Sequence, residues 1–124
     1  MTKPMVYIAS PYTLGDVAEN VANSIRVADA LVRFGFIPFA PLLSHFWQMI
    51  SPHPHEYWIA LDLEWVKRAD AVLRMFGESK GADIEVEFAK DNGIPVFYQM
   101  AALLNWREEQ NAKAKQVAPT GGPS

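Results

Sequence analysis

The sequence predicts one α/β domain built on a mainly parallel sheet, and three observations lead to this prediction. Short apolar runs of strand length recur along the chain, and most are followed by a longer stretch with helical periodicity. These runs are apolar throughout, which is typical of parallel strands covered by helices on both faces. Half of the 124 residues are apolar and a fifth are charged, as in ordinary globular domains. We therefore expect four or five strands in a doubly wound, three-layer α/β/α arrangement.

The first part of the chain predicts a strand, a helix and a second strand. Residues 5–9 form a short apolar run, and residues 16–34 have apolar side chains at helical spacing. Asp16 is well suited to cap the start of this helix. Residues 36–40 form the second strand, in which Pro38 favours an edge position because proline has no N–H to donate to a neighbouring strand.

The rest of the chain repeats this alternation after an irregular segment at residues 41–55, which has two helical turns at 44–50 before a proline-rich break. In chain order, the remaining predicted elements are a helix at 56–68, a strand at 70–76, a helix that begins after Ser79 and ends at Gly93, a strand at 94–98 and a helix at 101–115. This order is that of a flavodoxin-like domain. We expect the domain to occupy residues 1–110, followed by a flexible tail at residues 111–124.

Composition, charge and motifs exclude several functional classes. The absence of cysteine excludes a disulfide framework, a zinc site built on thiolates and a cysteine nucleophile, and the net charge of −3 gives no basic surface for a nucleic-acid polymer. His53 and His55 flank Pro54 without a third ligand, so we expect no metal site. Neither a GxGxxG nor a Walker loop is present, and we expect no cofactor. No apolar run approaches ~18 residues and no signal-peptide pattern occurs, so we expect a cytoplasmic protein without a membrane partner.

Two polar turns follow apolar strands and are expected at the same edge of the sheet. Residues 10–16 follow the first strand, and residues 77–80 follow the strand at 70–76. The carboxyl ends of parallel strands meet at one edge, where ligands bind in open α/β sheets. The helix that begins after Ser79 directs its free N–H groups to this edge, which favours an anion. Glu85, about one turn into that helix, can reach the same crevice.

The acidic and aromatic side chains near this edge have different interpretations. Glu85 is either a functional carboxylate or a residue that stabilises the helix dipole, whereas Glu87, two residues later, falls on another face and is expected at the solvated surface. Asp62 lies on a mainly apolar helix face, where burial would raise its pKa towards that of a general acid. Trp47 and Trp58 can stack on a planar base, although large aromatic side chains more often belong to the core.

Three segments occur in a characteristic order and at compatible spacing. They are Tyr7-Ile8-Ala9-Ser10-Pro11-Tyr12-Thr13, then Asp62-Leu63-Glu64-Trp65 followed by Ala69-Asp70, and finally Ser79-x-Gly81-x-x-x-Glu85-Val86-x-Phe88-Ala89. Their combination resembles the nucleoside 2-deoxyribosyltransferase family, including its 2′-deoxynucleoside 5′-monophosphate N-hydrolase branch and small uncharacterised relatives. The resemblance spans residues 5 to about 98. It implies a small-molecule nucleoside or nucleotide substrate.

The resemblance also implies a role for each matched residue. Glu85 would be the nucleophile that attacks the anomeric carbon of a (deoxy)ribosyl group, Tyr7 would orient its carboxylate, and Asp62 would be the general acid. Two carboxyl groups about 5–5.5 Å apart suit such a double displacement through a glycosyl-enzyme intermediate. Water as acceptor gives hydrolysis, and a second base gives transfer. Ser79 would bind a 5′-phosphate or 5′-hydroxyl, and the other implied substrate-binding residues are Gly81, Ser10, Pro11, Tyr12, Thr13 and Trp47.

The sequence departs from the family pattern at two positions. Glu87 stands where the better-known members have glycine, and Thr13 stands near the place of a phosphate-binding arginine in the nucleotide hydrolases. The second departure weakens the case for a nucleoside 5′-monophosphate as the substrate. Members of the family are oligomers whose sites take residues from a neighbouring subunit, so the resemblance implies a homo-oligomer, a dimer or larger.

Three alternative functions are compatible with the same pattern. A catalytically silent nucleotide-binding or regulatory module would use the same crevice, but it would need neither Asp62 nor Glu85. A phosphoribohydrolase of the lysine-decarboxylase-like type would contain Pro-Gly-Gly-x-Gly-Thr, which this sequence lacks. A flavodoxin-like electron carrier matches the fold alone, without a flavin-binding pattern. We therefore predict an enzyme that cleaves or transfers the N-glycosidic bond of (deoxy)nucleosides or nucleoside 5′-monophosphates.

Overall fold

The sheet consists of four parallel strands within the part of the chain that the structure describes. This is a computed structural model, and it describes the backbone of residues 3–121 and the side chains of residues 3–116. The central strands are β1 (Met5–Ala9) and β3 (Ala71–Arg74), and the edge strands are β2 (Ile37–Phe39) and β4 (Val96–Phe97). The order is β2-β1-β3-β4, and every neighbouring pair is parallel. The predicted α/β fold with a parallel, flavodoxin-like sheet is confirmed.

Pro38 lies in β2, which forms one edge of the sheet. β2 pairs only with β1, with Pro38 opposite Val6. An edge strand has a neighbour on one side only, so the missing N–H of proline leaves no gap in the ladder. The edge position expected for Pro38 is therefore confirmed.

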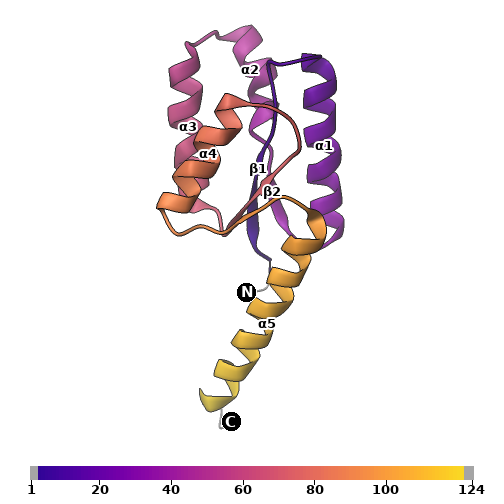
Figure 1. The fold of residues 1–124 in the computed structure, drawn as a ribbon, viewed down its shortest axis with the longest axis vertical. Coiled ribbons are helices and arrows are strands. Elements are labelled where there is room, and N and C mark those ends of the chain that lie inside the picture. The colour runs from indigo at the N-terminus through magenta and orange to yellow at the C-terminus, as the bar shows by residue number, and fades with distance from the viewer. Residues whose placement is uncertain (1–2, 122–124) are drawn as a thin grey trace.

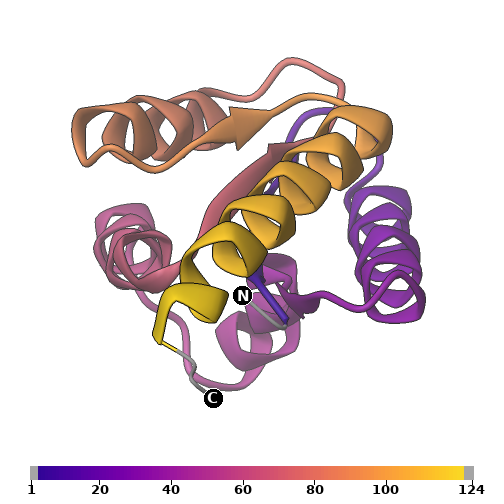
Figure 2. The same cartoon turned by 90° about the horizontal axis from the view of Figure 1, so that it is seen from below.

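Two pairs of helices cover the two faces of the sheet (Figures 1 and 2). The helices α1 (Val17–Arg33) and α5 (Met100–Gly121) pack on one face, where Leu31 and Leu103 join the buried side chains of β1 and β3. The helices α3 (His55–Arg68) and α4 (Lys80–Asp91) pack on the other face through Val66, Ala82, Val86 and Ala89. The result is the expected three-layer arrangement.

The central strand β1 contributes alternate side chains to the two apolar clusters. Val6 and Ile8 belong to the cluster beneath α1 and α5, whereas Tyr7 and Ala9 belong to the cluster beneath α3 and α4. All four side chains are fully buried. Because successive side chains of a strand point to opposite faces, the whole run must be apolar. This alternation also directs the Tyr7 hydroxyl towards α3 and α4.

Two short helical segments connect β2 to α3. A 3₁₀ turn, η1 (Pro41–Leu43), is followed directly by α2 (Ser44–Ile50). α2 corresponds to the two helical turns predicted at residues 44–50. After the break at Ser51–Pro54, α3 begins at His55.

The terminal helix is longer than the sequence predicts. α5 runs to Gly121, whereas we expected it to end at Lys115 and a flexible tail to begin at residue 111. The sequence beyond Trp106 is rich in Ala, Lys, Glu and Gln, which are strong helix formers and can continue a helix without packing. Figure 1 shows this part of α5 extending beyond the sheet. The last three residues of the expected tail, 122–124, lie outside the described residues.

No helix in the described part of the chain combines the length and apolar character needed to cross a membrane.

The start of α1 provides a test of the predicted cap. Asp16 accepts a hydrogen bond from the backbone N–H of Glu19 at 3.1 Å. Replacing Asp16 by alanine removes this bond, so we expect the free energy of unfolding in urea to fall by about 0.5–2 kcal/mol. The control is Asp29→Ala, which removes an acidic residue of the same helix that forms only an exposed ion pair with Arg33. Its expected effect is about 0.3–0.5 kcal/mol, and an equal loss in both variants would contradict the capping role.

Candidate active site

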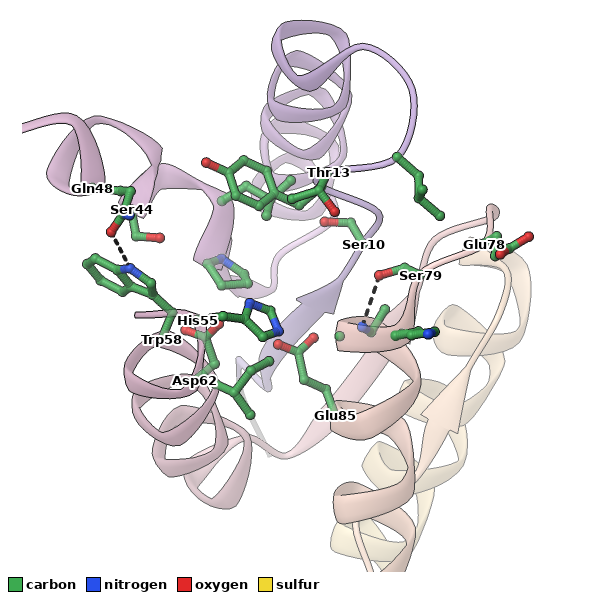
Figure 3. A pocket seen from close by; sticks show the side chains of 18 of the residues that line it. Ser10, Thr13, Ser44, Gln48, His55, Trp58, Asp62, Glu78, Ser79 and Glu85 are labelled. Carbon is green, nitrogen blue, oxygen red and sulfur yellow. Dashed lines mark hydrogen bonds between the residues drawn. The ribbon is translucent and has the colours of Figure 1, made fainter. Parts of the chain in front are cut away.

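A cavity of about 740 Å³ opens at the carboxyl ends of β1 and β3 (Figure 3). Its walls come from the loop after β1, from η1 and α2, from the first half of α3 and from the start of α4. The volume lies within the range of small-molecule sites. The cavity is thus at the sheet edge where the sequence predicts a ligand.

Side chains that line this cavity recur along the helices at helical spacing. On α3, His55, Trp58 and Asp62 line it, separated by three and four residues, so they form one stripe along the helix. On α2, Ser44 and Gln48 are four residues apart and also line it. Each helix therefore presents one face to the cavity.

Three side chains with ionisable groups meet at the base of the cavity. The hydroxyl of Tyr7 donates a hydrogen bond of 2.6 Å to Glu85 Oε2. Glu85 is only 5% exposed and Tyr7 is fully buried. Asp62, from α3, lines the same cavity as Glu85, close enough for each carboxyl group to affect the pKa of the other. Figure 3 shows both carboxyl groups directed into the cavity from facing helices.

Burial shifts the pKa values of all three groups upwards. It raises the pKa of Glu85 to about 8; the negative charge of Asp62 adds to this rise, while the Tyr7 hydroxyl and the Arg74 guanidinium oppose it. Burial also raises the pKa of Asp62 to about 7, and the nearby Glu85 carboxyl group counteracts part of that rise. The pKa of Tyr7 lies well above its usual value because of burial and then the neighbouring carboxylates. Tyr7 is therefore a permanent hydrogen-bond donor at physiological pH.

The two carboxyl groups behave as one titrating pair. Burial leaves both carboxyl groups with pKa values near neutrality, about 7 for Asp62 and about 8 for Glu85. Near neutral pH the pair holds about one proton beside one negative charge. Such a pair can supply a nucleophile and an acid at the same time.

One end of the cavity is rich in hydroxyl groups. Ser10, Thr13 and Ser79 gather there, as Figure 3 shows. Ser79 caps α4, because its Oγ accepts a hydrogen bond from the backbone N–H of Ala82 at 3.1 Å. Ser10 is 6% exposed, and its Oγ has no hydrogen-bond partner among the described residues. A buried polar group without a partner is uncommon, so this hydroxyl is available for a ligand.

The opposite end of the cavity is aromatic. Trp58 lines it and donates its indole N–H to Gln48 Oε1. On the far side, Trp47 packs edge to face on Trp58 with ring centroids 5.0 Å apart. His53 also packs against the edge of Trp58, at 5.7 Å. These contacts hold the Trp58 ring in one position.

The loop after β1 is held against its neighbours by specific contacts. Gly77 has φ +126°, and a Cβ at this position would lie 2.8 Å from Pro11 Cγ. The turn before α4 can therefore approach the loop only because residue 77 is glycine. From α1, the Asn20 side chain donates to the carbonyls of Tyr12 and Leu14 at 2.9 and 2.8 Å.

Most of the sequence-predicted residues meet at the cavity. The predicted residues that line it are Asp62, Glu85, Ser79, Gly81, Ser10, Tyr12 and Thr13, and Tyr7 lies beneath them through its bond to Glu85. Two of the predicted residues do not line the cavity. Pro11 packs against Gly77 instead of lining the cavity, and Trp47 is 47% exposed behind Trp58. Glu87 is exposed, as expected.

Gln48 and His55 line the cavity although the sequence did not predict them as site residues. Gln48 was assigned only to a short helix, although its spacing of four from Ser44 was a signal that both share a face. His55 was interpreted as part of a surface turn, although it lies seven residues before Asp62 on the same stripe. Among the described residues, no three His, Cys, Asp or Glu side chains are grouped in a way that could hold a metal ion.

Comparison with known proteins identifies the family. The model of the family described as "Domain of unknown function (DUF7768)" matches residues 4–99. The chain belongs to this family. No curated protein matches the sequence.

The structure of this DUF7768 protein is similar to a solved structure of a 2-deoxyribosyltransferase from Bacillus psychrosaccharolyticus. The TM-score is 0.55 and the identity is 22%, over 74% of this chain and 69% of that chain. That enzyme is described as a biocatalyst for the synthesis of nucleosides. The similarity shows that the two proteins share a fold.

The contact between Gly77 and Pro11 gives a prediction about the site. We expect Gly77→Ala to lower the free energy of unfolding by about 1–3 kcal/mol, since the variant adds both an unfavourable φ and a clash. The control is Gly93→Ala, which has φ +71° but no atom within 4 Å of its new Cβ. Urea denaturation of both variants separates the two effects. Adding Pro11→Ala should restore part of the loss in Gly77→Ala, and an absence of any restoration would contradict the proposed contact.

The carboxyl pair predicts a pH dependence of stability. Unfolded carboxyl groups titrate near pH 4, about 3 to 4 units below the folded pair, so the folded state binds more protons between these values. The free energy of unfolding should therefore fall as pH rises towards about 8, by about 1.4 kcal/mol per pH unit for each carboxyl that is protonated only when folded.

The measurement is urea denaturation between pH 5 and 9 of the wild type and of the double variant Asp62→Asn/Glu85→Gln. The variant has no carboxyl groups at these positions, so the difference between the two curves isolates the pair. A difference that does not change with pH would show that neither carboxyl is protonated in the folded protein.

Proposed function

We propose that this protein cleaves or transfers the N-glycosidic bond of (deoxy)nucleosides or nucleoside 5′-monophosphates, with Glu85 as the nucleophile. The observation that carries the proposal is the buried hydrogen bond between Tyr7 and Glu85 at a cavity of ligand size that Asp62 also lines. The fold shared with a 2-deoxyribosyltransferase supports the same chemistry.

The carboxyl pair supplies both groups that a double displacement needs. The reactive form of the pair is the one in which Asp62 holds the proton, although the pKa values of about 7 for Asp62 and about 8 for Glu85 make it the less populated form. In this form the ionised Glu85 carboxylate attacks the anomeric carbon and forms a glycosyl-enzyme ester. The bond between the sugar and the base breaks, and its electron pair leaves with the base nitrogen, which Asp62 protonates. In the second step, Asp62 accepts a proton from water or from a second base as that molecule attacks the anomeric carbon and releases Glu85.

Tyr7 has a positioning role in this mechanism. Its hydroxyl donates to Glu85 Oε2, so it holds one oxygen of the carboxylate and leaves Oε1 for the sugar. The same hydrogen bond lowers the pKa of Glu85 against the effect of burial, which favours the ionised form required for attack. The fully buried aromatic ring fixes the hydroxyl from beneath.

The two ends of the cavity suit the two ends of a nucleoside. A sugar above the carboxyl pair would place its 5′ group near Ser10 and Ser79, where an unpartnered hydroxyl and the N-terminus of α4 can bind a hydroxyl or a phosphate. Its base would then lie against Trp58. Because Asp62 lies one helical turn after Trp58 on α3, it is well placed to protonate that base.

We further propose that the protein is a homo-oligomer, as the family resemblance implies. Four apolar side chains of η1 and α2 support this, because each is more than half exposed: Leu43, Phe46, Met49 and Ile50. A cluster of apolar side chains on one short segment is typical of an interaction surface.

The test of the proposed function is a base-release assay. Purified protein is incubated with deoxynucleosides and deoxynucleoside 5′-monophosphates, and free base is measured by liquid chromatography. We expect Glu85→Gln to abolish release and Asp62→Asn to lower kcat by about 10²–10⁴-fold, as loss of a general acid does. The control is Glu87→Gln, two residues along the same helix but exposed, which should leave the rate unchanged.

The outcomes separate the enzyme from the alternatives. Adding a second base distinguishes transfer, which yields a new nucleoside, from hydrolysis. Undiminished release by Glu85→Gln would refute the nucleophile. Binding of a nucleoside in calorimetry without release from any substrate would instead indicate a silent binding module.

A further inference from the structure

We propose that Gln48 recognises the base, and that the cavity prefers bases with a carbonyl group at purine C6 or pyrimidine C4 over bases with an amino group at that position. The preferred substrates are then 6-oxopurine and 4-oxopyrimidine nucleosides or nucleotides. This inference rests on the proposed function and specifies its substrate class.

The hydrogen bonds of Gln48 determine how its amide is oriented. Its Oε1 accepts two hydrogen bonds, one from the indole N–H of Trp58 and one, of 2.9 Å, from the backbone N–H of His53. Both partners are donors and neither can accept. The opposite rotation of the amide would place its NH₂ group against two N–H groups, so only the observed orientation is compatible with these neighbours.

This orientation leaves Gln48 with donors alone for a ligand. Its oxygen is occupied twice, and its Nε2 has two N–H groups. A carbonyl oxygen of a base can accept from Nε2, whereas an exocyclic amino group would place donor against donor. Ser44, one turn earlier on the same face of α2, has a hydroxyl that can donate or accept, so it cannot discriminate. The discrimination therefore depends on Gln48.

Gln48 lies at the end of the cavity where the base of a bound nucleoside would lie. It is hydrogen-bonded to Trp58, which lies one helical turn before Asp62 on α3. Figure 3 shows Gln48 and Trp58 at one end of the cavity, and Ser10 and Ser79 at the other, with the carboxyl groups between them. A nucleoside with its sugar above the carboxyl pair and its 5′ group at the serines must direct its base to Gln48.

The neighbours of Gln48 make this recognition rigid. The ring of Trp58 is held edge to face by Trp47 at 5.0 Å and by His53 at 5.7 Å. The His53 ring in turn stacks on Tyr57 with centroids 3.9 Å apart and planes inclined by 13°. Both donors to Gln48 Oε1 thus belong to one packed aromatic cluster. An amide fixed in advance discriminates better than one that can rotate to suit either base.

The experiment compares substrates that differ only in the group that Gln48 would contact. The matched pairs are deoxyinosine with deoxyadenosine and deoxyuridine with deoxycytidine, and the readout is kcat/KM for base release. We expect the wild type to prefer the carbonyl member of each pair by about tenfold or more, because a mismatch leaves buried donors unpaired.

Two variants test the mechanism of this preference. In Gln48→Glu, one oxygen keeps the bonds to Trp58 and His53 and the other replaces NH₂, so the preference should reverse towards the amino members. In Trp58→Phe, the aromatic wall remains but one of the two donors to Oε1 is lost, so the amide is held less firmly and the preference for the carbonyl members should weaken. In Gln48→Met, which has no amide, the ratio of the kcat/KM values of the carbonyl and amino members should be near one.

A binding measurement distinguishes the failure of this inference from the failure of the proposed function. Calorimetry of the wild type with hypoxanthine, adenine, uracil and cytosine requires no turnover. Tighter binding of hypoxanthine and uracil without base release from any nucleoside would support the role of Gln48 and refute the enzyme. Base release with equal kcat/KM within each pair would overturn this inference and leave the enzyme in place. An equal loss of kcat/KM for both members of a pair in Gln48→Glu would also overturn this inference, because a purely structural role of Gln48 predicts that result.

Discussion

The hydrogen bond between Tyr7 and Glu85 joins the centre of the sheet to the helix that bounds the cavity, and the rest of the site depends on it. Tyr7 lies in β1, between the two apolar clusters, and it is fully buried. A carboxylate at the position of Glu85 would be strongly destabilising without partners, because it is removed from water. The tyrosine hydroxyl and the Arg74 guanidinium favour the ionised form of Glu85, whereas the nearby carboxyl group of Asp62 opposes it.

The same burial shifts the protonation of the two carboxyl groups and lowers the stability of the fold. Burial raises the pKa values of Asp62 and Glu85 to about 7 and about 8, so the pair retains a proton where an exposed pair would have lost both. An acid and a base with matched pKa values near neutrality suit proton transfer in catalysis. The apolar clusters on both faces of the sheet must supply the stability that two buried carboxyl groups reduce.

Several features of the site could be predicted from the sequence because they depend on local spacing. The apolar surroundings of Asp62 on its helix indicated a shifted pKa, and the Ser79 turn indicated a helix start at the ligand edge. The positions of Pro11 and Trp47 outside the cavity lining could not be predicted in this way. Both are adjacent in sequence to residues that line the cavity, but the contact of Pro11 with Gly77 and that of Trp47 with Trp58 direct them away from it. Such contacts join distant segments and have no local signal.

The sequence by itself determined the order of strands and helices along the chain, the edge position of Pro38 and the meeting of the two polar turns at one edge of the sheet. These follow from periodicity, from the missing N–H of proline and from the geometry of parallel strands. The contact of Tyr7 with Glu85 was expected only from the family resemblance. Tertiary structure alone decided that Gln48 faces the cavity with its amide oxygen already occupied, because that orientation depends on two donors from elsewhere in the chain.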